Sequence, residues 1–314
     1  MKTEILQDSR CGCFQLVHLT LKHFQYFQVV SIKEAISLLE KHGEEAKIIA
    51  GGTDLVPKLK ATETEPKYVV DISGIKDLNC IEDYREGLKI GAVTTYDTLN
   101  RSPLIMRKAP VLAEAAHEVG SVQIRNLGTI GGNLANASPA ADTVPPLIVS
   151  RASLKIIGPG KERLIPVENF FLSANASVLE KDELLADIQI PNMPANTGEA
   201  FIKLGRRAGP DLSIASVAVA LTLDGDICKD VRIALGSVGP TALRARKTED
   251  LLRGERLERK VLEECSEIVA NEIKPISDVR ASAEHRTEVT KSLVRNAVQI
   301  AMSREAGEGR HSHV

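Results

Sequence analysis

Two hydrophobic periods alternate along the first half of the chain. Apolar residues spaced three and four apart follow Ser31, and the helix that they predict begins at the S-x-x-E capping box Ser31–Glu34 and ends at Gly43. Continuous apolar runs at residues 47–50 and 68–71 predict short buried strands. The resulting order is helix, strand, glycine turn, short helix, strand.

The rest of this half continues to mix helices with strands. Strands are predicted at residues 88–93 and 153–157, and helices at residues 96–100, 111–119 and 142–149. Residues 128–139 form a second glycine-rich stretch, which we interpret as a loop. Turn-forming residues at 193–198 predict a linker.

The second half has a different character. Residues 214–223 and 231–236 are rich in β-formers and flank Asp224-Gly225, which predicts a hairpin. Two long amphipathic helices are predicted at about residues 258–272 and 284–302, and the polar residues 304–314 predict a disordered tail. The fold class is therefore α+β, in two domains.

Composition and charge then exclude several classes of partner. Apolar residues make up 43% of the 314-residue chain and charged residues 26%, which is typical of a globular protein. No apolar run approaches the roughly 20 residues that a bilayer crossing needs. A formal net charge of −2 and 3% aromatic residues argue against a nucleic-acid surface. The five cysteines form no disulfide framework and the first residues form no secretory signal, so we expect a cytoplasmic protein.

Residues 48–55, with the sequence IIAGGTDL, are the first candidate for chemistry. Consecutive backbone N–H groups in a glycine turn form an anion-binding nest that suits a pyrophosphate, and Thr53 adds a hydroxyl donor. The alternative is a tight turn between a strand and a helix. The pattern is neither G-x-G-x-x-G nor a P-loop, so nucleotide binding by those routes is not supported.

Residues 123–142, with the sequence QIRNLGTIGGNLANASPAAD, are the second candidate. Small hydrogen-bonding residues dominate this run, and no Lys or Glu lies between Asn126 and Ala141. Loops that wind closely around a ligand have this composition, although a structural loop of small residues remains the alternative. The hydrolase patterns G-x-S-x-G and H-E-x-x-H are absent from the sequence.

Four stretches in this order carry a family resemblance. They are AGGTDL at residues 50–55, TIGGNL with ASPxxD at residues 129–142, FIKLGRRxxxD at residues 201–211, and SDVRASAEHR at residues 277–286. Together they resemble the FAD-binding (medium) subunit of the molybdenum hydroxylase family, of the xanthine dehydrogenase and carbon monoxide dehydrogenase type. His285 departs from the family pattern, in which tyrosine is more usual at that place.

The resemblance implies a domain layout. Residues 23–195 would form a two-part FAD-binding domain of the vanillyl-alcohol-oxidase/PCMH type. Residues 199–303 would form a smaller C-terminal domain with an antiparallel sheet and helices. Residues 1–22 would be a lead-in and residues 304–314 a disordered tail.

The resemblance also implies the cofactor-binding residues. The first loop would hold the FAD pyrophosphate and the second loop would hold it from the other side, while later residues would reach the ribityl chain and the flavin. The implied set is Ile48, Ile49, Ala50, Gly51, Gly52, Thr53, Asp54, Leu55, Val119, Thr129, Gly132, Asn133, Ser138, Asp142, Leu185 and Lys203. For Lys203, a solvated surface charge is the alternative. Charges in the loop at residues 206–211 would tune the flavin.

The implied assembly has three kinds of subunit. A large subunit would carry the molybdenum cofactor and a small subunit the [2Fe–2S] clusters, in a dimer of heterotrimers. FAD on this chain would take electrons from the clusters and pass them to NAD⁺ or another acceptor. Molybdopterin and the clusters would lie only on the partners, and flavin N5 would be the reactive centre, so no side chain is assigned a catalytic role and no metal is expected.

Three features qualify this picture. Cys11 and Cys13 could form half of a metal or cluster site, but the sequence offers no matching partner cysteines. The chain lacks the cysteine-bearing insertion of the 4-hydroxybenzoyl-CoA reductases, so FAD is expected to be its only redox centre. Neither glycine loop contains histidine, so non-covalent FAD is favoured.

Two other functions remain open at this point. The first is a self-sufficient flavin oxidoreductase of the same superfamily, which would need its own substrate pocket and proton donor. The second is an interaction subunit that has kept the fold and lost the flavin. Flavin content separates the second from the others.

Overall fold

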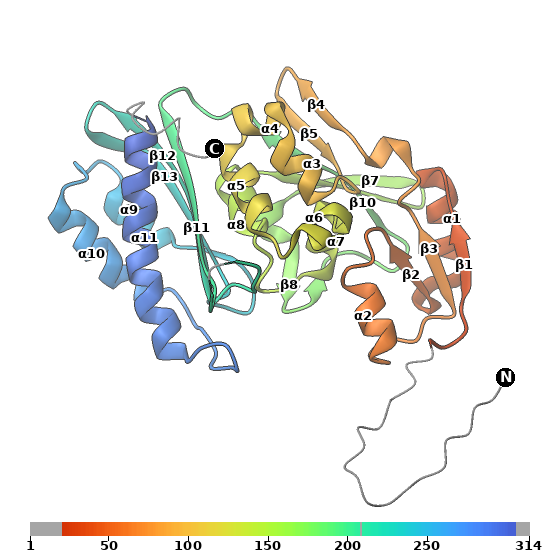
Figure 1. Cartoon of the computed structure of the whole chain (residues 1–314). Coiled ribbons are helices and arrows are strands. Elements are labelled where there is room, and N and C mark those ends of the chain that lie inside the picture. The colour runs from red at the N-terminus through yellow and green to blue at the C-terminus, as the bar shows by residue number, and fades with distance from the viewer. Residues whose placement is uncertain (1–20, 208, 306–314) are drawn as a thin grey trace, which may run out of the picture.

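The computed structural model describes residues 21–207 and 209–305 (Figure 1). The predictions for Cys11, Cys13 and nearly all of the lead-in and tail lie outside the described residues. Within them the fold mixes helices with four separate sheets, which confirms the α+β class. Figure 1 shows the C-terminal helices on one side of a sheet and the rest of the chain on its other side.

The N-terminal part is a three-stranded parallel sheet in the order β1-β3-β2, with α1 packed on β3. Strand β2, at one edge of this sheet, ends two residues before the Gly51-Gly52 turn. The elements are β1 (Gln25–Gln28), α1 (Ile32–His42), the 3₁₀ turn η1 (Gly43–Glu45), β2 (Ala46–Ile49), α2 (Leu55–Lys60) and β3 (Tyr68–Asp71).

A five-stranded antiparallel sheet in the order β4-β5-β10-β6-β7 follows. Its strands are β4 (Ile81–Tyr84), β5 (Gly87–Gly91), β6 (Ser153–Gly158), β7 (Lys161–Pro166) and β10 (Leu184–Pro191). Six short helices lie between β5 and β6, namely α3 (Tyr96–Arg101), α4 (Pro103–Lys108), α5 (Pro110–Glu118), α6 (Val122–Leu127), α7 (Ile130–Asn136) and α8 (Val144–Val149). The remaining elements are η2 (Lys76–Leu78), η3 (Val167–Asn169) and the small hairpin β8 (Phe171–Ser173) with β9 (Ala176–Ser177).

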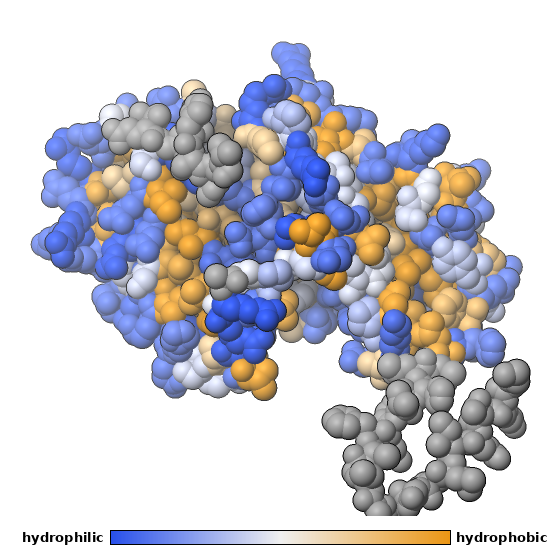
Figure 2. Space-filling model, viewed as in Figure 1, coloured by the Kyte–Doolittle hydropathy of each residue, from blue (hydrophilic) through white to orange (hydrophobic). Residues whose placement is uncertain are grey.

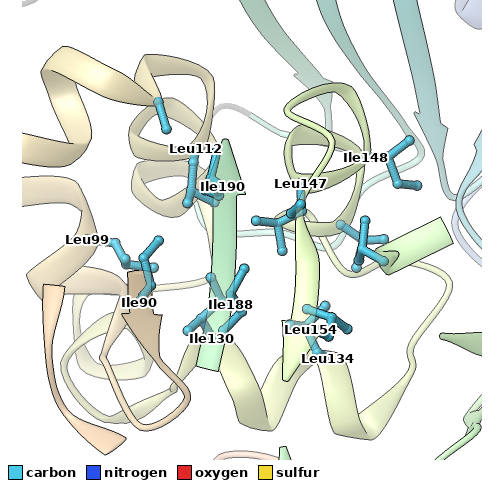
Figure 3. Close-up of a cluster of buried hydrophobic side chains, with 14 of the residues drawn as sticks. Ile90, Leu99, Leu112, Ile130, Leu134, Leu147, Ile148, Leu154, Ile188 and Ile190 are labelled. Carbon is cyan, nitrogen blue, oxygen red and sulfur yellow. The ribbon is translucent and has the colours of Figure 1, made fainter. Parts of the chain in front are cut away.

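The core of this domain lies between the sheet and its helices. Figure 3 shows Ile188 and Ile190 of β10 between Ile90 of β5 and Leu154 of β6, with Leu112 of α5 against them. All five side chains are buried. Burial of such a side chain contributes about 1.5–3 kcal/mol relative to its exposure, so this cluster holds the helices that carry the second glycine run.

The C-terminal part is a four-stranded antiparallel sheet in the order β11-β12-β13-β14, covered on one face by helices. The strands are β11 (Thr197–Leu204), β12 (Ala215–Asp224), β13 (Ile227–Gly236) and β14 (Leu243–Arg244). The helices are α9 (Arg246–Leu252), α10 (Arg259–Ala270) and α11 (Ala283–Glu305). Figure 2 shows polar side chains over much of the outer surface, with separate apolar patches between them.

Alternation along β12 divides its side chains between two cores. Val217, Val219 and Leu221 belong to the core under the C-terminal helices, whereas Ala218 and Ala220 belong to the core of the first domain. The alanine face lets α8 lie directly on the sheet, and α5 packs on β11 beside it. We call this contact of α5 and α8 with β11–β13 the seam.

Most predicted elements occur at or within a few residues of the expected places. Ser31 caps α1 by accepting a hydrogen bond from Glu34 N at 3.2 Å. The β12–β13 hairpin turns at Gly225, which has a φ of +59°. The last helix continues to Glu305, so Arg304 and Glu305 are helical rather than part of a tail, and β11 begins at Thr197, inside the predicted linker.

One prediction about local structure was wrong. The glycine-rich run at residues 128–139 is not a loop throughout, because α7 occupies seven of its residues. Thr129 caps α7 by accepting from Gly132 N at 3.1 Å, and Gly131 N donates to Ala92 O at 2.8 Å. Tertiary packing on Ala92 therefore overrides the low helix propensity of the two glycines.

Three negative findings apply to residues 21–207 and 209–305. No helix there is long and apolar enough to cross a membrane. The three described cysteines, Cys80, Cys228 and Cys265, are free. No cluster of His, Cys, Asp or Glu in this part of the chain is arranged to hold a metal ion.

Candidate functional site

The two glycine-rich runs meet at one pocket of about 580 Å³. The first run contributes every residue from Ile48 to Leu55, and the second contributes residues around the start of α7. We call these two segments, residues 48–55 and 129–136, the cradle. A volume of this size lies within the range of ligand and cofactor pockets. A larger hollow of about 790 Å³ lies elsewhere and includes none of the predicted residues.

Close backbone contact brings the two runs together. A Cβ atom on Gly51 would lie 1.9 Å from the carbonyl oxygen of Leu127, which no side chain could tolerate. The Gly128 carbonyl accepts from Tyr96 N at 3.1 Å, and a Cβ on Gly128 would lie 2.8 Å from the Tyr96 ring. Gly51 is therefore required for contact between the two runs.

Other glycines shape the pocket itself. Gly52 has a φ of +70°, a left-handed conformation that favours glycine. A Cβ on Gly132 would contact only the Thr129 hydroxyl, at 2.8 Å, so one side of this residue faces the pocket. Helix α7 begins at the pocket with Thr129 as its N-cap and without an acidic residue in its first turn, whereas the N-cap of α2 is Asp54. The positive end of α7 and the glycine residues beside it fit a diphosphate better than a cation.

Polar side chains link the two halves of the cradle. Lys58 Nζ donates to Asn136 Oδ1 at 2.6 Å, and Asn136 Nδ2 donates to Asp54 Oδ1 at 3.1 Å. Behind them, the Thr143 hydroxyl donates to Asn133 Oδ1 at 2.7 Å. These bonds hold α2 against α7 across the pocket mouth.

A second group of polar residues, which we call the seam cluster, joins the end of α5 to β11. Lys203 Nζ donates to Asp142 Oδ2 at 2.7 Å and to the Glu118 carbonyl at 2.8 Å, and the Ser213 hydroxyl donates to Asp142 Oδ1. Asp142 and Lys203 are both buried at this pair. Burial raises the pKa of the Asp142 carboxyl above its ordinary value, and the bonds from Lys203 and Ser213 oppose this rise.

The structure therefore distributes the predicted residues over two places. Twelve of the sixteen line the cradle pocket, namely Ile48, Ile49, Ala50, Gly51, Gly52, Thr53, Asp54, Leu55, Thr129, Gly132, Asn133 and Leu185. Asp142 and Lys203 form the seam cluster, and Val119 follows Glu118 at the end of α5. Ser138 lies in the turn after α7, where its hydroxyl accepts from Ala140 N at 3.3 Å.

The sequence interpretation missed several residues of both places. Lys58 and Asn136 join the halves of the cradle, and Ser213 completes the seam cluster. Lys58 stands four residues after Asp54 on α2, a spacing that places both side chains on one helix face. No local pattern pointed to Ser213, because its contact with Asp142 joins residues 71 positions apart.

Comparison with known proteins identifies the family. Residues 22–193 match the family described as the FAD binding domain in molybdopterin dehydrogenase. Residues 200–301 match the CO dehydrogenase flavoprotein C-terminal domain. The boundary between the two matches falls just before and inside β11.

Relatives cover nearly the whole chain. The carbon monoxide dehydrogenase medium chain of Hydrogenophaga pseudoflava is 33% identical over 90% of this chain and 98% of the relative. The glyceraldehyde dehydrogenase medium chain of Sulfolobus acidocaldarius is 32% identical over 87% of this chain and 96% of the relative. A solved structure of the Hydrogenophaga pseudoflava carbon monoxide dehydrogenase superposes with a TM-score of 0.88, at 34% identity, covering 91% of this chain and 99% of that one.

These matches place the fold in a defined class of flavoprotein. The chain belongs to the family of FAD-binding medium subunits of molybdenum hydroxylases, as its sequence motifs predicted. It is a subunit of an oxidoreductase, and FAD is the cofactor of its N-terminal domain.

Proposed function

We propose that this chain carries electrons between the [2Fe–2S] clusters of a small partner subunit and NAD⁺ or another acceptor. A large partner subunit would hold the molybdenum cofactor, and the three would form a dimer of heterotrimers in the cytoplasm. The supporting observation is the convergence of both glycine-rich runs on one pocket. Bound FAD would supply the electron-transfer chemistry. Substrate choice would then belong to the molybdenum partner.

Within the pocket, we assign the pyrophosphate of FAD to the cradle. Backbone N–H groups of residues 48–55 would bind it from one side, and Thr129, Gly132 and Asn133 from the other. Leu185 would make an apolar contact, since it lines the same pocket. The cradle holds no histidine, so the cofactor would be bound without a covalent bond.

We assign the flavin end to the seam cluster. Lys203 and Asp142 would hold the ribityl and flavin part, with Ser138 and Val119 beside them. Both charges are buried together, and a buried ion pair presents a fixed electrostatic field to a cofactor with little reorganisation. The FAD-binding domain would span residues 23–195 and the C-terminal domain residues 199–303.

FAD binding by the full chain tests the two assignments separately. In Lys203→Met, affinity for FAD should fall about tenfold, whereas affinity for ADP, which shares only the adenosine diphosphate half, should stay unchanged. Lys89→Met is the control, because Lys89 pairs with the exposed Glu82 outside both places. Equal losses for FAD and ADP would show that Lys203 does not act at the flavin end.

The assembly is tested by purification from the native host. An untagged preparation should contain flavin, iron–sulfur absorption and two further subunits. The chain alone should bind FAD but turn over acceptors slowly. A lone yellow protein with rapid turnover would indicate a self-sufficient flavoenzyme instead, and a colourless chain that takes up no FAD would contradict the proposal.

A further inference from the structure

Arg286, in the first turn of α11, is the largest fully buried side chain among the described residues, with 1% of its surface exposed. A buried cation is strongly unfavourable unless its donors find acceptors. The Arg286 guanidinium donates to the Ile214 carbonyl, to the Ser237 carbonyl at 3.1 Å and to Asp278 Oδ1 at 2.8 Å. One side chain thus joins three separate segments of the C-terminal domain.

Two of these segments hold the loop that leads from the cradle to the seam cluster. Ser213, the neighbour of Ile214, donates its hydroxyl to Asp142. Ser237 N donates to the Pro139 carbonyl at 3.0 Å. Ser237 has a φ of +64°, a conformation that a non-glycine residue rarely adopts without outside support. The Arg286 bond to the Ser237 carbonyl supplies that support.

We propose that Arg286 is a positioning residue for the cofactor site, holding Ser213 and Ser237 so that they fix residues 139–142 and the Asp142–Lys203 pair. The proposal rests on the function proposed above, in which that pair lies at the flavin end. Arg286 itself touches neither the cradle nor Lys203, so its effect on the cofactor must pass through Ser213 and Ser237.

The charge of Asp142 makes the effect measurable. The groups that act on this carboxyl are Lys203 on β11, Glu118 on α5 and Ser213, and Asp142 in turn acts on Tyr96 of α3. The Ser213 bond lowers the pKa of Asp142, whereas burial and Glu118 raise it. Loss of the Ser213 bond should therefore raise this pKa, so that protonation releases Lys203 at a higher pH.

Arg280 offers a matched control on the same carboxylate. Its guanidinium donates to Asp278 Oδ2 at 2.9 and 2.6 Å, but no bond joins it to Ile214 or Ser237. If Arg286 served only the stability of the C-terminal domain, substitutions of Arg280 and Arg286 would both act on melting and neither would act on the pH dependence of FAD binding.

The experiment titrates the full-length apoprotein with FAD from neutral pH down to the lowest pH at which the chain stays folded, so that the loss of binding on acidification is recorded. The variants are Arg286→Lys, Ser213→Ala, the double variant and Arg280→Gln, with thermal melting measured in parallel. Lysine keeps the charge of Arg286 but cannot reach both carbonyls and Asp278 at once.

Arg286→Lys and Ser213→Ala should each weaken FAD binding about tenfold. The pH at which binding is lost on acidification, which we call the acid limb, should rise by about one unit in each variant. The double variant should bind FAD less than tenfold more weakly than Ser213→Ala alone, because Ser213→Ala already removes one of the two routes by which Arg286 acts. Arg280→Gln should bind like the unmodified chain. Additive losses, or a lowered melting temperature with an unchanged acid limb, would overturn the proposal.

A second variant covers a failure of Arg286→Lys to fold. Asp278→Asn removes the charged partner that orients Arg286 while leaving both carbonyl bonds possible, so the acid limb should move in the same direction by a smaller amount. An unmoved limb in Asp278→Asn would also overturn the proposal. If the unmodified chain takes up no FAD, the proposed function itself is contradicted. If the unmodified chain binds FAD and the variants bind it with the same affinity and pH dependence, only the proposed role of Arg286 is contradicted.

Discussion

The cradle and the seam are built from different chemical groups. In the cradle, glycine lets backbone approach backbone, as at Gly51 and Leu127, and Asp54 is the one charged residue of its two segments. In the seam, the alanine face of β12 is accompanied by ion pairs between the domains, among them Asp142–Lys203 and Glu114–Arg304. Where backbone packs on backbone, as at Gly51, there is no room for an added side-chain atom. A contact made by an ion pair instead depends on pH and on the presence of both charged partners.

The largest effect is expected where the cradle leaves no room. In Gly51→Ala the new Cβ would collide with the Leu127 carbonyl, so the two runs must separate. We expect a loss of about 3 kcal/mol or more in the free energy of unfolding and most of the bound FAD. Denaturant unfolding and flavin absorbance would measure both.

Gly74→Ala is the matched control, because its Cβ would meet only the Val29 carbonyl at an ordinary 3.4 Å. Full FAD binding by Gly51→Ala would show that the two loops need not touch, which would remove the main difference between cradle and seam.

In the seam, the strongest pH effect should come from Glu199 on β11. This buried carboxyl has one oxygen without a hydrogen-bond partner, and burial raises its pKa from 4.5 to about 7. Because the folded pKa exceeds the unfolded one, the folded chain binds the extra proton. Stability is therefore highest below pH 4.5 for this group and falls as the pH rises to about 7.

Glu199→Gln should remove that loss. Above pH 7.5 we expect the variant to be more stable than the unmodified chain by about 3 kcal/mol, and below about pH 4 to be equal to it. Unfolding by denaturant across this pH range gives the result. A pH slope that is identical in the two proteins would show that Glu199 does not titrate in the folded state.

A smaller loss is expected from the ion cluster at the seam edge. Glu168 on η3 pairs with Arg232, with Arg246 at 2.7 Å and with Arg244 at 3.3 Å, all from the C-terminal domain. Glu168→Gln leaves two largely buried arginines without this countercharge, at a cost of about 2 kcal/mol. FAD affinity should change little, which would separate seam stability from cradle function.

The exposed pair of Glu82 and Lys89 provides the comparison, since Glu82→Gln should change stability by less than about 0.5 kcal/mol. If the two substitutions cost the same, the burial of the Glu168 cluster has no energetic consequence.

The smallest effect should come from the side-chain hydrogen bonds that join the two segments of the cradle. Asn136→Ala removes the bonds to Lys58 and Asp54, with an expected loss of about 1 kcal/mol. FAD should also dissociate several-fold faster, by stopped-flow measurement. Unchanged dissociation would confine Asn136 to a structural role.

Sequence reasoning succeeded where local chemistry decides. The Ser31–Glu34 cap, the strand at residues 68–71 and the hairpin at Asp224-Gly225 each depend on neighbours in the chain. Periodicity and capping describe such elements well. The same reasoning failed for α7, because contact with Ala92, distant in sequence, stabilises a helix in a run that glycine content marks as a loop.

The sequence by itself determined which residues are small enough to surround a cofactor and which family the chain resembles. Only the tertiary structure showed that Gly51 is needed against Leu127, that Ser213 binds Asp142, and that Arg286, distant in sequence, binds the Ile214 carbonyl next to Ser213. The physical reason is that backbone conformation is encoded locally, whereas buried polar groups must find partners wherever folding brings them.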